Sequence, residues 1–318
     1  MIQIFTKIKG FKANSILMKL KTLISIFFFS TSVLFAEESN SISKTFEYGL
    51  KAQNITYFPY ETSSTFRQSQ SNLKNNKDFA YLPFIKYRNK GNKFGFDFDM
   101  IDVNLNNPYF KGVLLGNNAI SSTITYGNAK RQEFRFNFFY LPMESEIFYF
   151  GLGILKIDRF YKNQNFEDYS IIYSDKINSY GISLPLRSKI QLYEGLEINL
   201  GFDPYLTYGN RHYVNQRFSQ VYNGDGSRGS SFYLTKTNPN NITEILGFQA
   251  EISLSYKFYE NFRFYIGFSR NQSKIRSINF DQTNYSYRND FLYITSGYTF
   301  EKLIDTHNSI YFGISNTH

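Results

Sequence analysis

The residues of this 318-residue chain best suited to catalysis are its histidines, of which there are three: His212, His307 and His318. A histidine beside a serine or a carboxylate can activate a weak nucleophile for hydrolysis. His212 is the strongest candidate, because Asp203 or Asp225 could orient its ring and Ser219 is close in sequence. The chain therefore allows a hydrolase that uses His212.

The surroundings of His212 favour a simpler interpretation. Residues 208–212 match no known hydrolase motif, and the segment follows a predicted strand that ends at Tyr208. His307 lies in a predicted short turn, and His318 is the last residue. We therefore expect His212 to be a solvated loop histidine, and we predict no catalytic residue and no enzyme.

Two acidic motifs could hold a cation, and both have a plainer explanation. Residues 223–229 resemble a calcium loop, but their single aspartate is too few for an EF-type site. Asp97 and Asp99 lie on one face of a predicted strand, where basic residues opposite them would explain both carboxylates. The chain has no cysteine and no phosphate-binding glycine loop. We expect no metal and no cofactor.

The elements that position these residues are strands, because hydrophobic and polar residues alternate along most of the chain. Residues 246–258 alternate strictly, with Leu246, Phe248 and Ala250 at the start of the apolar series. Successive strand side chains point to opposite faces of a sheet. The same pattern recurs from residue 46 to residue 314, with a weaker strand at 81–88 that Pro83 interrupts. The sequence predicts an all-β protein.

The predicted turns divide into short and long ones. Short turns are expected near residues 90, 143, 194, 260 and 304, about 50 residues apart. Long polar loops are expected at 58–79, 103–130, 159–178, 210–243 and 271–287. Short turns at one end and long loops at the other are typical of transmembrane β-barrels.

The N-terminus has the features of an export signal. Lys19 and Lys21 precede an apolar run at 23–36 that ends in Ala36, after which cleavage is expected. Residues 1–36 are thus predicted to be an upstream extension plus a secretory signal peptide, followed by one barrel domain at 37–318. This segment holds five lysines and no acid, so its removal lowers the net charge from +9 to +4. That balance gives no support to a nucleic-acid partner.

A closed barrel in a membrane explains both faces of the strands. In hydrocarbon every backbone polar group must be paired, so an exported membrane β-protein must close on itself. The polar face carries charges of both signs, which can pair inside a narrow lumen. The residues predicted to face the lumen are Asp97, Asp99, Glu133, Arg135, Arg187, Glu197, Asp203, Glu251, Lys257 and Arg263. The main alternative is a secreted or periplasmic β-protein, because a soluble sandwich gives the same alternation.

At the level of pattern, residues 44–316 resemble the outer-membrane β-barrel proteins of diderm bacteria. In that family the last strand ends in an aromatic residue, and the best copy here is residues 293–300, ending at Phe300. The chain continues to His318 with another strand-like piece, so Phe300 is internal, the last strand is atypical or the chain is incomplete. We predict a monomeric up-and-down antiparallel barrel of about 12 strands, with ten as the second choice. A strand missed by the pattern is expected at 120–126.

The resemblance implies an outer-membrane protein that contacts lipid and the barrel-assembly machinery. The first functional hypothesis is a narrow channel for small polar or ionic solutes. The alternative is a surface protein whose long loops bind an extracellular ligand, and the third is a barrel hydrolase using His212.

Overall fold

The computed structural model describes residues 44–62, 72–115, 120–142, 147–165, 170–222, 228–237, 241–259, 261–278, 282–288, 291–297 and 303–317. These residues are almost entirely strands. The barrel strands are β1 (Lys44–Phe58), β2 (Lys77–Asn89), β3 (Phe94–Leu105), β6 (Asn128–Tyr140), β7 (Phe148–Asn165), β8 (Ser170–Ser183), β9 (Leu186–Tyr193), β10 (Leu196–Tyr222), β12 (Ile242–Tyr259), β13 (Phe262–Ser277) and β16 (Leu303–Thr317). Among the described residues, no helix is long and apolar enough to cross a membrane.

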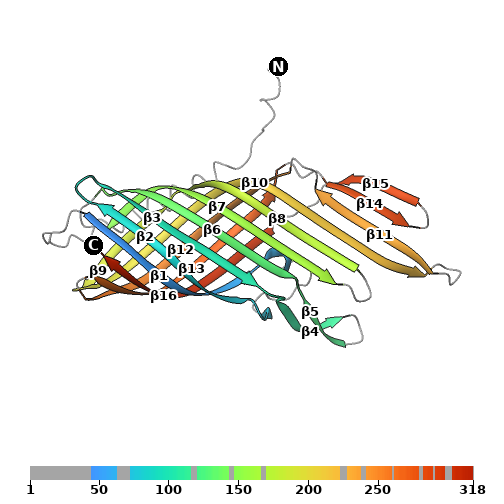
Figure 1. Ribbon diagram of the computed structural model, residues 1–318, viewed down its shortest axis with the longest axis horizontal. Helices are drawn as coiled ribbons and strands as arrows, with labels where there is room; N and C mark the ends of the chain where they lie inside the picture. The colour runs from blue at the N-terminus through green and yellow to red at the C-terminus, as the bar shows by residue number, and fades with distance from the viewer. Residues whose placement is uncertain are drawn as a thin grey trace, which may run out of the picture. The chain divides into compact units, whose positions relative to one another are not determined.

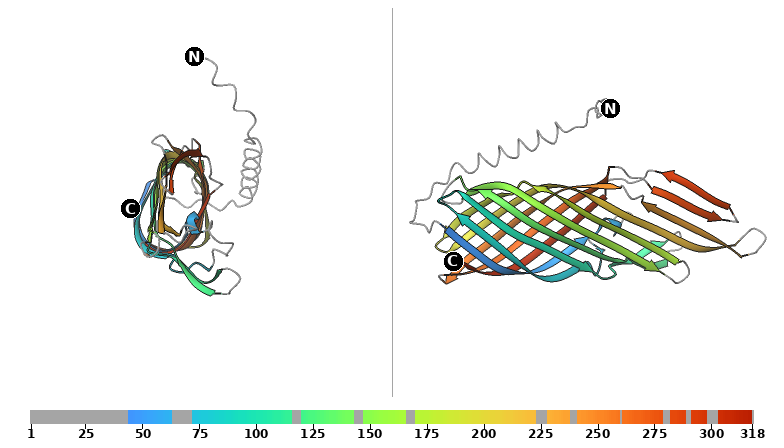
Figure 2. Two further views of the ribbon diagram at one scale, coloured as in Figure 1. Left: turned by 90° about the vertical axis from the view of Figure 1, so that its right-hand side faces the viewer. Right: turned by 45° about the horizontal axis from the view of Figure 1, so that its top comes forward.

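Antiparallel pairing closes these strands into a barrel (Figures 1 and 2). Strand β1 pairs with β2 on one side and with β16 on the other, and β10 pairs with β12. Strands β8 and β9 occupy one position, because both pair with β7 and β10 on either side of Leu184 and Pro185. The predicted closed antiparallel barrel is confirmed, and it has ten strands, the second of the two predicted numbers.

The strands outside the barrel explain why twelve is too many. The strand expected at 120–126 exists as β5 (Ile120–Thr125), but it pairs with β4 (Tyr109–Leu115) in a separate two-stranded sheet. Part of the aromatic-ended run at 293–300 forms β15 (Phe291–Gly297), which pairs with β14 (Gln282–Arg288); Phe300 lies outside the described residues. The strand that closes the barrel is β16, so the short turn expected near residue 304 is wrong.

The outward face of the barrel is apolar from the end with the short turns up to one level along the strands, beyond which its side chains become polar. On β10 the outward side chains from Leu196 to Tyr208 are mostly apolar, and Asn210 begins a polar stretch. The same change occurs on neighbouring strands at Asp102, Gln132, Asp158 and Asn178, each paired in register with the next. Lipid favours the apolar side chains, so this level marks the outer boundary of the membrane-spanning band.

Several strands continue beyond this boundary. Strand β10 has 27 residues, whereas about 9–11 residues suffice to cross a bilayer. Its far part pairs with β8 and with β11 (Arg228–Thr237). Strand β11 pairs in turn with β14, and β14 pairs with β15. Much of the loops predicted at 159–178 and 210–243 is therefore strand. Both chain ends of the barrel lie at the short-turn end, since Glu47 pairs with Thr317, and we assign this end to the periplasm.

The ladder between β2 and β3 is short. It joins only Ile85–Asn89 with Phe94–Phe98, although β2 pairs with β1 along its whole length. Pro83, predicted to interrupt this strand, pairs with Leu50 of β1 two residues beyond the end of the β2–β3 ladder. Proline has no N–H to donate to a neighbouring strand, and this fits the loss of pairing on one side.

Candidate functional site

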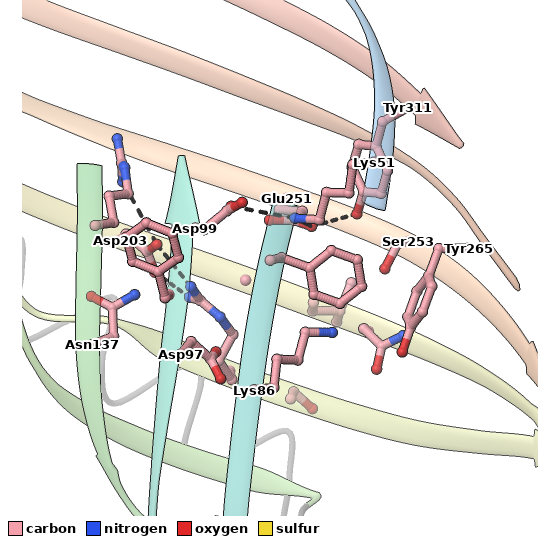
Figure 3. A pocket seen from close by; sticks show the side chains of 18 of the residues that line it. Lys51, Lys86, Asp97, Asp99, Asn137, Asp203, Glu251, Ser253, Tyr265 and Tyr311 are labelled. Carbon is pink, nitrogen blue, oxygen red and sulfur yellow. Dashed lines mark hydrogen bonds and ion pairs between the residues drawn. The ribbon is translucent and has the colours of Figure 1, made fainter. Parts of the chain in front are cut away.

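The barrel interior is filled with ion pairs on the periplasmic side (Figure 3). Lys51 Nζ lies 3.3 Å from Asp99 and 3.9 Å from Glu251. Arg187 forms a bidentate ion pair with Asp203, in which Nη2 lies 2.9 Å from Oδ2. Because strand side chains alternate between faces, residues such as Lys51 stand between outward Leu50 and Ala52 and point inward.

The residues predicted to face the lumen fall into this arrangement, with one exception. Pairs form between Asp97 and Arg88 at 2.6 Å, Glu133 and Arg135 at 2.5 Å, Arg135 and Asp203 at 3.7 Å, and Glu197 and Arg263. Lys257 is exposed beside the turn after β12. The structure therefore brings nine of the ten residues into buried or half-buried ion pairs and leaves Lys257 at the surface.

A second group of charges lies just beyond the outer boundary of the lipid band, and we call it the outer network. It consists of Glu61, Arg131, Arg159, Asp175, Arg211 and Asp305. Arg159 lies at its centre, with Nε 2.7 Å from Asp305 and Nη1 2.9 Å from Glu61. Arg131 binds Asp305 at 3.1 Å, and Arg211 binds Asp175 at 2.8 Å. All six residues are buried, so the network joins opposite walls of the barrel through side chains.

A single turn of 3₁₀ helix, η1 (Tyr60–Thr62), completes the outer network from within the barrel, and we call it the plug. All three of its residues are buried. The Tyr60 N–H donates to Asp305 at 2.8 Å, and the Arg159 guanidinium lies 4.1 Å from the centre of the Tyr60 ring. The ring also packs against apolar residues of the inner wall, including Leu155 and Tyr205. Burial raises the pKa of the Glu61 carboxyl, although the Arg159 charge opposes this.

Most of the outer network has no recognisable pattern in the sequence. Glu61, Arg159, Asp175 and Arg211 fall in segments predicted to be long loops, and Asp305 falls in the predicted short turn. Their strands lie beyond the lipid band, where the outward residues become polar and the hydrophobic alternation fades. Arg131 could have been found, because it continues the inward series of Glu133 and Arg135.

Two polar cavities lie between the plug and the periplasmic end. The inner cavity measures about 60 Å³, and Lys51, Asp99, Asp203 and Glu251 are among the residues that line it (Figure 3). The second measures about 130 Å³ and lies at the strand ends beside the short turns. Lys86, Tyr149, Asn199 and Tyr265 line both, so the two cavities adjoin.

The structure does not bring together the candidate catalytic residues that it describes. His212 is exposed on the outward face of β10, whereas Asp203 is buried on the inward face and bound to Arg187. An odd spacing along a strand separates residues onto opposite faces. Asp225 and the Ser219 side chain lie outside what the structure describes.

The acidic motifs and the remaining histidines also have defined places where they are described. Asp97 and Asp99 pair with different cations, Arg88 and Lys51. His307 is buried within β16, contrary to the predicted turn, and His318 lies outside the described residues. Most of the loop at 223–229 also lies outside them. In the described part of the chain, no group of three His, Cys, Asp or Glu residues is arranged to hold a metal ion.

Comparison with known proteins identifies the family. The model of a family described as "Predicted outer membrane protein, Leptospiraceae" matches residues 43–317. The chain belongs to this family. The family and the barrel fold place the protein in the outer membrane, with its apolar band in lipid. The predicted signal peptide lies outside the described residues.

Solved structures with a similar arrangement are outer-membrane barrels of low sequence identity. The outer membrane protease OmpT from Escherichia coli is 13% identical, with 91% of this chain and 100% of that chain covered and a TM-score of 0.41. The toluene transporter TodX of Pseudomonas putida is 10% identical, with coverages of 87% and 90% and a TM-score of 0.32. Neisserial surface protein A is 12% identical, with coverages of 85% and 96% and a TM-score of 0.27. No curated protein matches the chain.

Proposed function

We propose that this protein is a surface-exposed interaction barrel that binds an extracellular polypeptide through the strands projecting beyond the membrane. The observation that carries this proposal is a second apolar surface on those strands, separated from the lipid band. Between the two surfaces, the outward face of β10 carries Asn210, His212, Val214 and Gln216, three of which are polar. The second surface therefore stands in the aqueous compartment outside the membrane.

We call this second surface the outer patch. It comprises Phe218, Phe232, Leu234, Tyr285, Tyr287, Leu292 and Ile294. Phe218 pairs with Phe232, Phe232 with Tyr287, and Tyr287 with Leu292, so these side chains share one face of the sheet. Leu292 and Ile294 are each 60% exposed. Contiguous exposed apolar residues outside lipid mark interaction surfaces.

The charges around the outer patch indicate what kind of partner fits. Strands β11, β14, β15 and the part of β10 beyond His212 carry no acidic residue, and Lys236 lies on the face of the patch, with its ammonium group 5.6 Å from the centre of the Tyr285 ring. Complementary charge steers a partner and suppresses the wrong ones. The patch is thus suited to an extended segment that alternates apolar and acidic residues.

A binding measurement on the folded barrel tests the proposal. The probes are two short synthetic peptides, one alternating valine with glutamate and one alternating valine with lysine, followed by fluorescence anisotropy. We expect the glutamate peptide to bind at least tenfold more tightly. The double variant Leu292→Ser/Ile294→Ser should lose this binding. The control Phe160→Ser, an exposed outward residue of β7 outside the patch, should keep it. Equal binding of both peptides, or no effect of the double variant, would refute the proposal.

A narrow channel is the second candidate, supported by the two adjoining polar cavities on the periplasmic side of the plug. Passage through the barrel would require the plug and its bonds to Asp305 and Arg159 to move. In planar bilayers we expect the natural chain to conduct little and the variant Tyr60→Ala/Glu61→Ala to conduct more. A double variant as silent as the natural chain would count against a channel.

A further inference from the structure

The sheet that carries the outer patch ends in a strand with one free edge. Strand β15 pairs with β14, and it pairs with no other strand in the described part of the chain. It therefore lies at the margin of the sheet (Figures 1 and 2). Successive residues of a strand direct their main-chain N–H and C=O groups to opposite sides, so about half of these groups in β15 point away from β14.

The free edge of β15 is regular and uncharged. Its seven residues include no proline and no charged residue, and its ladder with β14 runs through seven pairs without a register shift. Proteins usually protect exposed edges with prolines, charges or bulges. This chain has such features elsewhere: Pro83 lies where the β2–β3 ladder is absent, and the β4–β5 ladder shifts register between Phe110 and Val113. Strand β15 thus keeps an edge that a further strand can join.

The side chains of the outer patch are most exposed at this same edge. Phe232 and Tyr285, on strands inside the sheet, are half-buried, whereas Leu292 and Ile294 on β15 are each 60% exposed. A strand side chain is covered mainly by the residues opposite it on the two neighbouring strands. Leu292 and Ile294 face Tyr287 and Tyr285 of β14, and no other described strand lies opposite them. The missing cover would come from one more strand beside β15.

We propose that the partner of the outer patch binds as an added strand, with its main chain hydrogen-bonded to the free edge of β15. The proposal rests on the proposed function and specifies how the extended segment is held. An edge of seven residues is about 23 Å long at 3.3 Å per residue, so a partner segment of similar length fits. Its apolar residues would lie beside Leu292 and Ile294 and continue the patch. Main-chain bonds then supply affinity and alternate side chains supply specificity.

The charge of these strands favours a foreign acidic segment over a second copy of this chain. Strands β11, β14, β15 and the outer part of β10 hold no acidic residue, and Lys236 lies on the face of the patch. Two copies joined edge to edge would bring together two sheets without a carboxylate to pair with either lysine. Glutamates of a foreign segment would meet charge of the opposite sign.

N-methylated forms of the glutamate peptide test the proposal on the folded full chain. One probe carries an N-methyl group on every valine and the other on every glutamate, and fluorescence anisotropy measures their binding beside that of the unmodified peptide. An added strand uses the N–H groups on only one of its sides, which belong to only one of these two sets. Each methylated peptide is therefore the matched control for the other.

We expect one methylated peptide to bind about tenfold or more weakly than the unmodified peptide, as for the loss of two main-chain hydrogen bonds, and the other to bind within about threefold. Amide hydrogen exchange gives a second readout. The unmodified peptide should slow exchange at alternate residues of Phe291–Gly297. It should leave exchange in the separate β4–β5 sheet unchanged, and the lysine peptide should slow neither.

Three results would overturn the proposal in distinguishable ways. Equal binding of the two methylated peptides, whether strong or weak, would exclude an added strand; if the unmodified peptide still requires Leu292 and Ile294, the proposed function stands without it. No binding of the unmodified peptide would overturn both. A natural chain that is dimeric in detergent, and that the glutamate peptide makes monomeric, would assign the edge to a second copy in place of a foreign segment.

Discussion

Replacing Arg159 with methionine tests whether the outer network holds the plug in the barrel. The guanidinium binds Asp305 at 2.7 Å and Glu61 at 2.9 Å, and it covers the Tyr60 ring. Arg159→Met leaves these two carboxylates buried with one fewer cation. Removing one partner of a buried pair usually costs about 3–5 kcal/mol. We therefore expect the free energy of unfolding to fall by about that amount.

The measurement is urea unfolding in detergent followed by far-UV circular dichroism, because the chain has no tryptophan to report by fluorescence. The same strand supplies a control in Lys156→Met. Lys156 binds Asp158 at 2.7 Å on the outward face, where its side chain is 38% exposed. Such pairs contribute about 0–1 kcal/mol. If Arg159→Met costs no more than Lys156→Met, the outer network does not hold the plug and the reasoning is refuted.

Three further substitutions test the fold and the histidine. Pro83→Val restores an N–H where the β2–β3 ladder stops, so we expect a gain of about 1 kcal/mol and slower amide exchange there; unchanged exchange would contradict this. His212→Ala should leave the urea midpoint unchanged, because the ring is exposed, and equal phospholipid and peptide hydrolysis by both proteins would remove His212 as a catalytic residue. Gly151→Ala should lower the free energy of unfolding by about 1–3 kcal/mol, because a Cβ there meets the Phe138 carbonyl of the neighbouring strand. The control is Gly91→Ala, whose Cβ meets only a side chain at 3.6 Å. Equal urea midpoints for the two variants would show that the backbone moves apart at Gly151 without cost.

The lipid-spanning half of the barrel could be predicted, because side chains that face lipid must be apolar and therefore alternate with the inward polar ones. Along β12 and β13 every outward side chain from Phe262 to Phe268 and from Leu246 to Phe258 is apolar, and the short turn between them follows directly. Inward charges such as Glu133 and Arg135 also stand out against this background. The alternation predicts the face of the sheet on which each side chain lies, but it does not predict which residue that side chain contacts.

The half of the barrel beyond the lipid band could not be predicted, because outward side chains that face water need not be apolar. Beyond Asn210 the outward face of β10 mixes His212, Val214 and Gln216, so a strand there has the composition of a loop. The plug has no periodic pattern at all, and its three residues are recognised only by what they contact. Twelve strands are predicted in place of ten because β5 and β15 have strand-like sequences. The sequence pattern does not show that both strands pair outside the barrel.

The pairing of β1 with β16 has a consequence for assembly. Strand β16 also pairs with β13, so the final fifteen-residue strand completes two ladders at once. Until it arrives, β1 and β13 each present a row of unsatisfied main-chain groups that hydrocarbon does not tolerate. The barrel therefore gains little by entering lipid strand by strand from β1, and its commitment to the bilayer depends on the arrival of β16.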